Sequence, residues 1–478
     1  MNLPKRPTVG RRTFLKGMGV VGLTAATGLG ARQLIPGVGS TKLTGTYSGL
    51  KIKRYHLAAT DGWVAMPPGS AALPPYFPDP LAPSYTQGHG YYVMGFRDVT
   101  SYAAFEGDPD TGEFPTNSAV TGQKNKAQIA APILFARVGE DLRLHLANLG
   151  LAARPDLTDP HTIHFHGFPN QTAYFDGVPD ASLAAPPGRT LTYRYIPEDP
   201  GTYMWHCHVE DVEHVHMGLT GVCFVLPSKG PNYAYDYEET KFDRQFAMIL
   251  TEADVRDHYN DAHLQINDFS TWSPTFRLMN GRAWPDTILG NIDPATGTQL
   301  DGVAMSGSSL TRLRYNPISS LIQANSGEKI LVRISNLGYE EHSLVMPGIQ
   351  FRVIGRDAKP LVLGRPDYLA PPPAVGAAYA NGSRPDISWY TDRVDLGPGE
   401  SRDLLFTAPS VGARTVFPFY DRNGNADANT NIGSMRTEVH VFPAGSLPVQ
   451  PQGSIMDQTL PTTPIYVPNQ LFTSGGAM

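Results

Sequence analysis

Histidine and cysteine, two side chains that bind transition metals, are concentrated in a small part of this sequence. Seven of the 14 histidines and one of the two cysteines fall in three short windows, His161–His166, His206–His208 and His214–His216. On a strand, side chains two residues apart share one face, so each His-x-His segment presents two imidazoles together. In the second window Cys207 lies between two histidines and points to the opposite face. The spacing therefore predicts four imidazoles on one face of a sheet and a thiol on the other.

The residues around the cysteine indicate which metal this cluster suits. We expect His161 and His214 to stand at turn-like strand ends, where both could approach Cys207. Two imidazoles and one thiolate, with a weak axial group, form the electron-transfer geometry of copper. We therefore predict a copper site at these three residues. His216 is expected to be a solvent-facing neighbour of this site.

The composition favours a β-rich scaffold for these windows. The chain has 478 residues, of which 41% are hydrophobic and 17% charged, which excludes disorder over its whole length. Its 48 glycines and 43 prolines suit short strands joined by many turns. The net charge of −6 argues against a nucleic-acid partner, and two cysteines, Cys207 and Cys223, make no disulfide framework.

An internal repeat predicts how this scaffold is divided. Residues 139–150 and 327–338 both alternate apolar and polar residues and end in Asn-Leu-Gly, as a half-buried strand followed by a turn does. A Pro-Gly pair and a later glycine follow in each copy at the same spacing, from Pro187 to Gly201 and from Pro398 to Gly412. Two strand-rich copies predict two β-sandwich domains. We place these domains at 45–227 and 241–445, with a linker at 228–240 and a C-terminal tail at 446–478.

The N-terminus has the features of a targeting signal. Arg11 and Arg12 precede an uncharged, mildly apolar run from Gly17 to Ala31, which is too short and too rich in glycine for a membrane span. Residues 1–40 are therefore predicted to be a twin-arginine export signal and leader, cleaved after about Ala31. This signal predicts a location in the periplasm or cell envelope.

The histidine windows resemble the multicopper oxidase family of cupredoxin domains. The matching motifs are His-x-x-His-x-His-Gly from His161, and His-Cys-His from His206 followed by a later His and Gly. Phe175–Pro179 and Asn280–Asp286 also resemble segments of that family. The resemblance implies an all-β fold with two cupredoxin-like Greek-key β-sandwich domains, and an oxidoreductase that binds copper.

The resemblance also implies a role for each candidate ligand. His161, Cys207 and His214 would bind type 1 copper, with Leu219 at the axial position and Met217 as its competitor. His214 follows the cysteine by seven residues, where the family more often has five. The remaining four histidines would bind type 2 and type 3 coppers and act as the catalytic centre: His164, His166, His206 and His208.

The second repeat departs from the family pattern. A trinuclear centre in this family uses eight histidines, four from each of two facing domains, and the first repeat supplies four. Aligned through the repeat landmarks, His161 matches His342, whereas His164 matches Val345 and His166 matches Pro347. The same alignment matches residues 206–208 with 417–419. Three explanations stay open for the missing ligands: first-repeat faces of two copies meet, the second site holds fewer coppers, or it binds none.

The leading hypothesis is an exported copper-dependent oxidoreductase. It would pass electrons from a small donor or a metal ion through type 1 copper to a second copper centre that reduces oxygen to water. An acidic loop at Glu210, Asp211 and Glu213 would admit a cationic donor, or is simply solvated. By analogy with two-domain relatives, the protein would form a homotrimer.

Two alternatives remain. One is a copper-binding electron-transfer or storage protein without oxygen chemistry, as the missing ligands suggest. The other is a copper nitrite reductase, which is weaker because that family has an aspartate at His164 and a catalytic histidine at Pro347.

Overall fold

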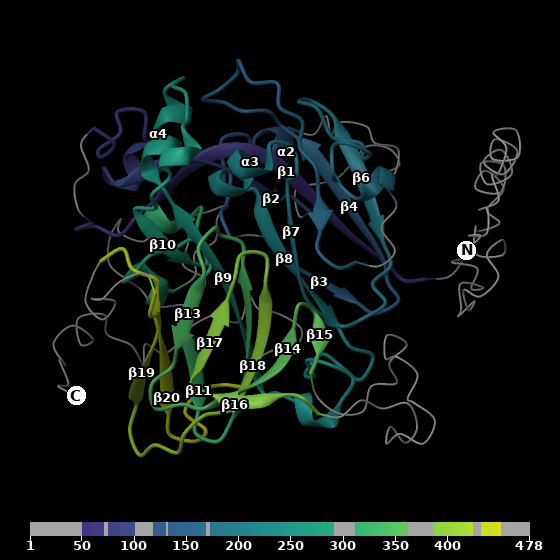
Figure 1. The fold of residues 1–478 in the computed structure, drawn as a ribbon, viewed down its shortest axis with the longest axis vertical. Helices are drawn as coiled ribbons and strands as arrows, with labels where there is room; N and C mark the ends of the chain where they lie inside the picture. The colour runs from purple at the N-terminus through teal and green to yellow at the C-terminus, as the bar shows by residue number, and fades with distance from the viewer. Residues whose placement is uncertain are drawn as a thin grey trace, which may run out of the picture. The chain divides into compact units, whose positions relative to one another are not determined.

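Strands are the main regular structure of the described residues, as the computed structural model shows (Figure 1). The structure describes residues 50–70, 75–100, 118–130, 132–168, 173–290, 311–361, 386–423 and 432–450. The predicted export signal and most of the predicted tail lie outside these residues. No helix within the described ranges is both long and apolar enough to cross a membrane.

Two four-stranded sheets come from the first part of the chain. Their strand orders are β2-β1-β4-β6 and β3-β8-β7-β5. The strand bounds are β1 Ile52–Ala65, β2 Gly90–Asp98, β3 Ile133–Arg137, β4 Asp141–Asn148, β5 His164–Phe165, β6 Thr190–Tyr195, β7 Gly201–His206 and β8 Thr220–Leu226. Leu57 and Leu144 of one sheet share a buried cluster with Trp205 and Cys223 of the other. The two sheets therefore pack face to face.

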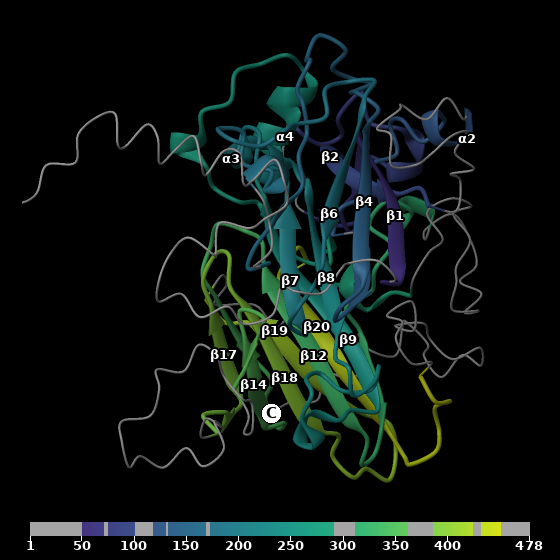
Figure 2. The same ribbon diagram turned by 90° about the vertical axis from the view of Figure 1, so that its right-hand side faces the viewer.

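Two larger sheets follow in the second part of the chain (Figure 2). One has seven strands, with the order β10-β9-β12-β18-β14-β15 and with β16 paired to β14, and the other has the order β11-β20-β19-β13-β17. The strands of the larger sheet are β9 Arg244–Ala253, β10 Phe276–Met279, β12 Lys329–Asn336, β14 Phe351–Arg356, β15 Lys359–Pro360, β16 Trp389–Thr391 and β18 Ser401–Thr407. Those of the smaller sheet are β11 Ile322–Asn325, β13 His342–Val345, β17 Arg393–Leu396, β19 Thr415–Asp421 and β20 Arg436–Phe442. Val332 and Leu404 share a second core with Leu344 and Val439.

The described helices are short and lie between strands. The α-helices are α2 Ser118–Thr121, α3 Asp211–Met217 and α4 Val255–Ala262. Six single turns of 3-10 helix are η2 Ser84–Thr86, η3 Ala173–Phe175, η4 Glu238–Thr240, η5 Phe269–Thr271, η6 Asp286–Ile288 and η7 Thr311–Leu313. The protein is therefore mainly β, as predicted.

The sequence repeat corresponds to a repeat of hydrogen bonds. Asn148 ends β4, its backbone carbonyl accepts from Gly188, and its side-chain oxygen accepts from Gly150. Asn336 ends β12 and makes the same two bonds, with Gly399 and Gly338. Each asparagine amide also donates to the carbonyl of a residue that pairs with a histidine, Ala185 opposite His161 and Leu396 opposite His342. The structure thus agrees with the alignment of His161 with His342.

The alignment of the second histidine window was wrong by three residues. His164 pairs with His206, and the aligned Val345 pairs with Tyr420. The counterpart of Cys207 is therefore Asp421, and not Pro418. The alignment failed because it was anchored at Gly201 and Gly412. The stretch from this glycine to the end of the strand is longer in the second copy.

His342 is not an isolated histidine, because it lies between two carboxylates. Its Nδ1 is 2.8 Å from Oδ2 of Asp421 and its Nε2 is 2.6 Å from Oε1 of Glu252, and all three side chains are buried. Burial lowers the pKa of His342, but the hydrogen bonds to Asp421 and Glu252 raise it to about 9. The same contact lowers the pKa of Asp421 despite its burial. The second repeat thus holds a buried imidazolium.

The two pairs of sheets are joined by a buried polar contact. Asp403 of β18 accepts from the hydroxyl of Thr202 in β7 at 2.6 Å and from that of Tyr235 at 2.7 Å, and Arg333 of β12 lies beside it. Tyr235 belongs to the predicted linker and is fully buried. The described residues from 51 onward group into one compact unit, so the division into two domains stays a prediction.

The buried imidazolium predicts a pH-dependent stability. Because the folded pKa of His342 is higher than its ordinary value of about 6.5, its contribution is complete below that value and disappears as the pH rises through about 9. We expect His342→Gln to lower the free energy of unfolding at pH 6 by about 3–5 kcal/mol, the usual cost of leaving buried charges unpaired. The difference between the wild type and the variant should shrink towards pH 9.5.

Urea unfolding at intervals between pH 6 and 9.5 measures this difference. His263→Gln is the control, because His263 contacts a single carboxylate, that of Asp79. A difference that stays constant over the whole range would contradict the imidazolium assignment.

Candidate metal centre

The strand β7 carries the candidate cysteine into the interior. Cys207 directly follows β7, and its backbone N–H donates to the carbonyl of Leu219, just before β8. Because β7 and β8 are antiparallel, this bond places Cys207 opposite Leu219, with both side chains on one face. The sulfur is thereby directed into the core between the two sheets, where Cys207 is fully buried.

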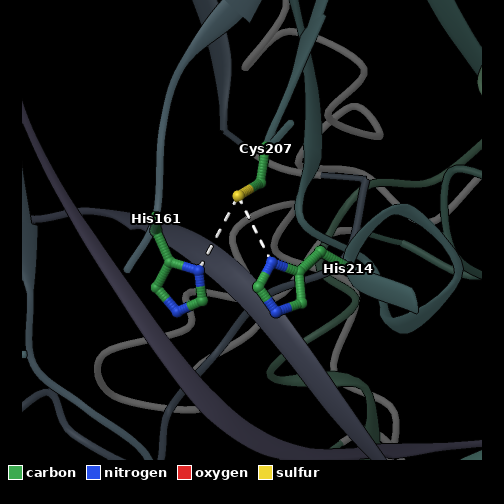
Figure 3. A group of neighbouring side chains, drawn as sticks. All are labelled: His161, Cys207 and His214. Carbon is green, nitrogen blue, oxygen red and sulfur yellow. Dashed lines mark hydrogen bonds between the residues drawn. The ribbon is translucent and has the colours of Figure 1, made fainter. Parts of the chain in front are cut away.

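The structure brings His161, Cys207 and His214 together (Figure 3). The Cys207 Sγ lies 3.7 Å from Nδ1 of His161 and 3.4 Å from Nδ1 of His214, and both rings are buried. A metal with bonds of about 2.3 Å to sulfur and about 2.0 Å to nitrogen, at angles of about 110–120°, would separate these atoms by about 3.5–3.7 Å. The two sulfur–nitrogen distances are close to these values, so the three side chains fit a shared metal ion with little movement.

The charges in this group suit a metal-binding thiolate. Burial raises the pKa of Cys207, but hydrogen bonds and attraction from His161 and His214 lower it well below its ordinary value. The backbone N–H of Thr162 also lies 3.4 Å from the sulfur. Burial lowers the pKa of His214, but Asp159 and the Cys207 thiolate raise it to about 10. A thiolate is the form in which cysteine binds metals.

Two side chains are candidates for the axial position of a bound metal. Met217 ends α3 three residues after His214 and so shares its face of the helix, and Leu219 lies opposite Cys207. Both are buried in the same cluster as the cysteine. His161, Cys207 and His214, with the thioether of Met217 beside them, resemble a type 1 copper site. The choice of Leu219 over Met217 stays a prediction.

The four remaining histidines form a second group behind the cysteine. The ligand atoms of His164, His166 and His206 lie within 4.8 Å of one another, and the two Nε2 atoms of His166 and His206 are 3.0 Å apart. The ring of His208 lies 5.0 Å from that of His164 and stacks on that of His206. Sequence spacing predicted this grouping on one face.

Hydrogen bonds prepare these imidazoles for a metal. The Nδ1 of His164 lies 2.6 Å from the carbonyl of Asp176, and the Nδ1 of His206 lies 2.7 Å from that of Cys207. Each Nδ1 therefore donates its proton to a carbonyl, which leaves the lone pair on Nε2. Burial lowers the pKa of His206 to about 3, so this ring is neutral, and burial also lowers the pKa of His166. An imidazole that keeps its proton on Nδ1 offers the Nε2 lone pair to a metal.

An acidic group adjoins the first site. The carboxylate of Asp159 lies 3.9 Å from Nε2 of His214, and together with the exposed Glu210 they form a third set of possible ligands. Contact with His214 lowers the pKa of Asp159, whereas burial raises that of Glu213. Sequence analysis assigned Asp159 no role, although it stands two residues before His161.

The expectation for His216 was wrong. This side chain is buried, its ring centroid lies 4.6 Å from that of the buried His258 in α4, and its Nδ1 accepts from the indole of Trp272 at 3.4 Å. His216 lies on α3, and this helix directs its side chain toward residues of the second half of the chain. The sequence pattern gave no sign of this helix or of its partner.

Comparisons with known proteins agree with this geometry. Residues 116–230 match the profile of a family described as multicopper oxidase. The chain is 25% identical over 294 residues to copper resistance protein A of Pseudomonas syringae pv. tomato, which covers 56% of this chain and 44% of that protein. It is 32% identical over 118 residues to the copper-containing nitrite reductase of Neisseria gonorrhoeae, covering 24% of this chain and 26% of that protein. The chain thus spans less than half the length of these curated relatives.

A solved structure shows the same fold. The multicopper oxidase mgLAC superimposes with a TM-score of 0.51 at 18% identity, over 83% of this chain and 87% of that chain. The fold of the present chain is of the cupredoxin-like type found in multicopper oxidases. The segment 116–230 contains every histidine and cysteine of the two candidate groups. Over this segment the chain is similar to the multicopper oxidase family.

Proposed function

We propose that this protein is a copper-dependent oxidoreductase that passes electrons from a small donor or a metal ion to oxygen. The observation that carries the proposal is the position of Cys207. Its sulfur lies between His161 and His214, and its two sequence neighbours belong to the histidine group on the other face. Two metal-binding groups are thus joined through one residue.

The residues of the chain prepare this site for electron transfer. Copper, when bound, would supply the one-electron chemistry and the reduction of oxygen to water. The buried His161, Cys207 and His214 exclude water and provide a thiolate with two imidazoles. The backbone of Cys207 connects directly to His206 and His208, so only a few covalent bonds separate the two ligand groups. This short path is the physical reason for an uninterrupted His-Cys-His segment.

The second centre is only partly supplied by one chain. His164, His166, His206 and His208 are four of the eight histidines that the family uses, and the second repeat has Val345 and Pro347 where the first has histidines. The rings of His164, His166 and His208 are not completely buried. We propose that this face meets another copy of the chain, in a homotrimer. The paired arginines support export by the twin-arginine route to the periplasm or cell envelope.

The acidic group favours a cationic donor. Glu210 is exposed, and its carboxylate lies within 4.8 Å of ligand atoms of Asp159 and His214. A cation held there would be next to a ligand of the proposed type 1 site. A donor of this kind would transfer its electron through the His214 ring.

Two alternative functions keep specific support. The missing half of the second centre favours electron transfer without oxygen chemistry. The match to a nitrite reductase favours nitrite as the acceptor, but His164 and Pro347 replace residues that nitrite reduction uses in that family. The oxygen assay below separates these alternatives.

The thiolate is tested by exchanging the two cysteines. We expect the copper-loaded wild type to show an intense visible band from thiolate-to-copper charge transfer. Cys207→Ser should abolish the band because an alcohol replaces the thiolate. Cys223→Ser is a matched control, since Cys223 is equally buried and burial raises its pKa. Absorption spectroscopy with copper analysis checks this, and a band that survives in Cys207→Ser would overturn the site.

The histidine group is tested by separating the two centres. We expect His166→Ala to reduce oxygen consumption with a phenolic donor to the background rate and to leave the visible band in place, because His166 is not in the sulfur group. Nitric oxide release with nitrite is measured in parallel. A wild type with the band but no oxygen consumption would favour the electron-transfer alternative, and nitric oxide release would favour nitrite reduction.

The donor is tested at Glu210. We expect Glu210→Gln to raise the KM for ferrous or cuprous ion about two- to fivefold, the effect of one exposed charge interaction. The KM for a neutral phenol should not change. Steady-state kinetics with both donors measure this, and equal effects on both would argue against a cation site. Glu238→Gln is the control, because Glu238 is an exposed carboxylate in a different part of the chain.

A further inference from the structure

The helix α3, which carries His214, is too short to be stable by itself. It has seven residues, and isolated helices below about 12–15 residues are marginal in water. Its N-cap, Glu210, has a left-handed backbone with φ 46° and ψ 52° and makes no side-chain capping bond. A capping bond of that kind would stabilise the first turn. The position of His214 must therefore depend on contacts from outside the helix.

One such contact comes from the second half of the chain. The hydroxyl of Tyr339 donates to the backbone carbonyl of Val212 at 2.6 Å and lies 3.5 Å from that of Asp211. These two carbonyls belong to the first turn of α3. Tyr339 follows β12 and precedes β13, so the bond connects the second repeat to the helix that holds a candidate ligand.

Tyr339 is itself held in place. Its backbone N–H donates to Oε2 of Glu252 at 2.7 Å, and the other oxygen of Glu252 lies 2.6 Å from His342. Its ring packs edge-on against that of Trp272, with centroids 5.6 Å apart, and Trp272 donates to His216 of α3. Contacts with Glu252 and Trp272 therefore hold the tyrosine in place, and Glu252 is in turn bound to the imidazolium of His342.

We propose that Tyr339 is a positioning residue for the candidate copper ligand His214. The inference rests on the proposed copper function. The hydroxyl fixes the first turn of α3 and thereby the approach of the His214 ring to Cys207. The second repeat, which has Asp421 at the position of the cysteine, would thus help to determine the ligand geometry of the first repeat.

The role can be separated from simple stabilisation. Tyr339 is 37% exposed, so after Tyr339→Phe the carbonyl of Val212 can bond to water and the ring can keep its packing. The spectrum and potential of a copper–thiolate site depend on ligand geometry and on outer hydrogen bonds. A purely structural bond would change stability and leave both unchanged.

The experiment compares Tyr339→Phe with Tyr85→Phe in the full chain. Tyr85 is a matched control, because its hydroxyl also donates to one backbone carbonyl, that of Trp63, at 2.8 Å. In copper-loaded protein we expect Tyr339→Phe alone to shift the visible band and the reduction potential and to weaken copper binding about 10-fold. In copper-free protein we expect faster amide hydrogen exchange across residues 211–217, again only in Tyr339→Phe.

The outcomes distinguish the two proposals. A wild type that binds copper without a thiolate band overturns the proposed type 1 site. Unchanged hydrogen exchange in α3 of Tyr339→Phe overturns the positioning role whether or not copper binds. Faster exchange with an unchanged band and potential also overturns it, because α3 would then move without effect on the site.

Discussion

A thiolate buried between two imidazoles is the interaction on which the first half of this structure depends. A buried anion is costly unless it is paired and hydrogen-bonded, and Cys207 obtains that compensation from His161, His214 and the backbone N–H of Thr162. The sulfur points into the core because β7 and β8 are antiparallel and place the cysteine side chain on their inner face. The same pleat turns His206 to the opposite face. One strand thereby serves two metal-binding groups.

The second half also compensates buried charges, but it has a carboxylate at the position of the thiol. Asp421 stands at the position of Cys207 and accepts from Ser343, as the sulfur accepts from Thr162, and His342 stands at the position of His161. Glu252 then takes the other side of the imidazole. Both nitrogens of His342 are occupied by carboxylates, so this ring has no lone pair for a metal. A proton on the imidazole compensates the buried carboxylates here, whereas a metal ion fits the corresponding group in the first half.

Polar side chains connect the two halves of the chain. Asp403 of β18 binds Thr202 of β7, close in sequence to the His-Cys-His segment. Tyr339 donates a hydrogen bond to the helix α3. The second repeat thus contacts the elements that hold the first site, although it has other residues at the positions of His164, His166 and Cys207.

The sequence by itself determined which residues could bind a metal. Period-two spacing separates the cysteine from its neighbouring histidines on any extended strand, so the two groups at residues 161–214 were predictable from local geometry. The repeat at Asn148 and Asn336 was predictable because the same Asn-Leu-Gly turn recurs, in which each asparagine accepts from the glycine two residues on. Only the tertiary structure decided what faces these groups. The counterpart of Cys207 is Asp421 because strand pairing, and not the distance from a glycine, sets that register. His216 is buried, and Tyr339 reaches α3, through contacts between residues far apart in the chain, for which no local pattern exists.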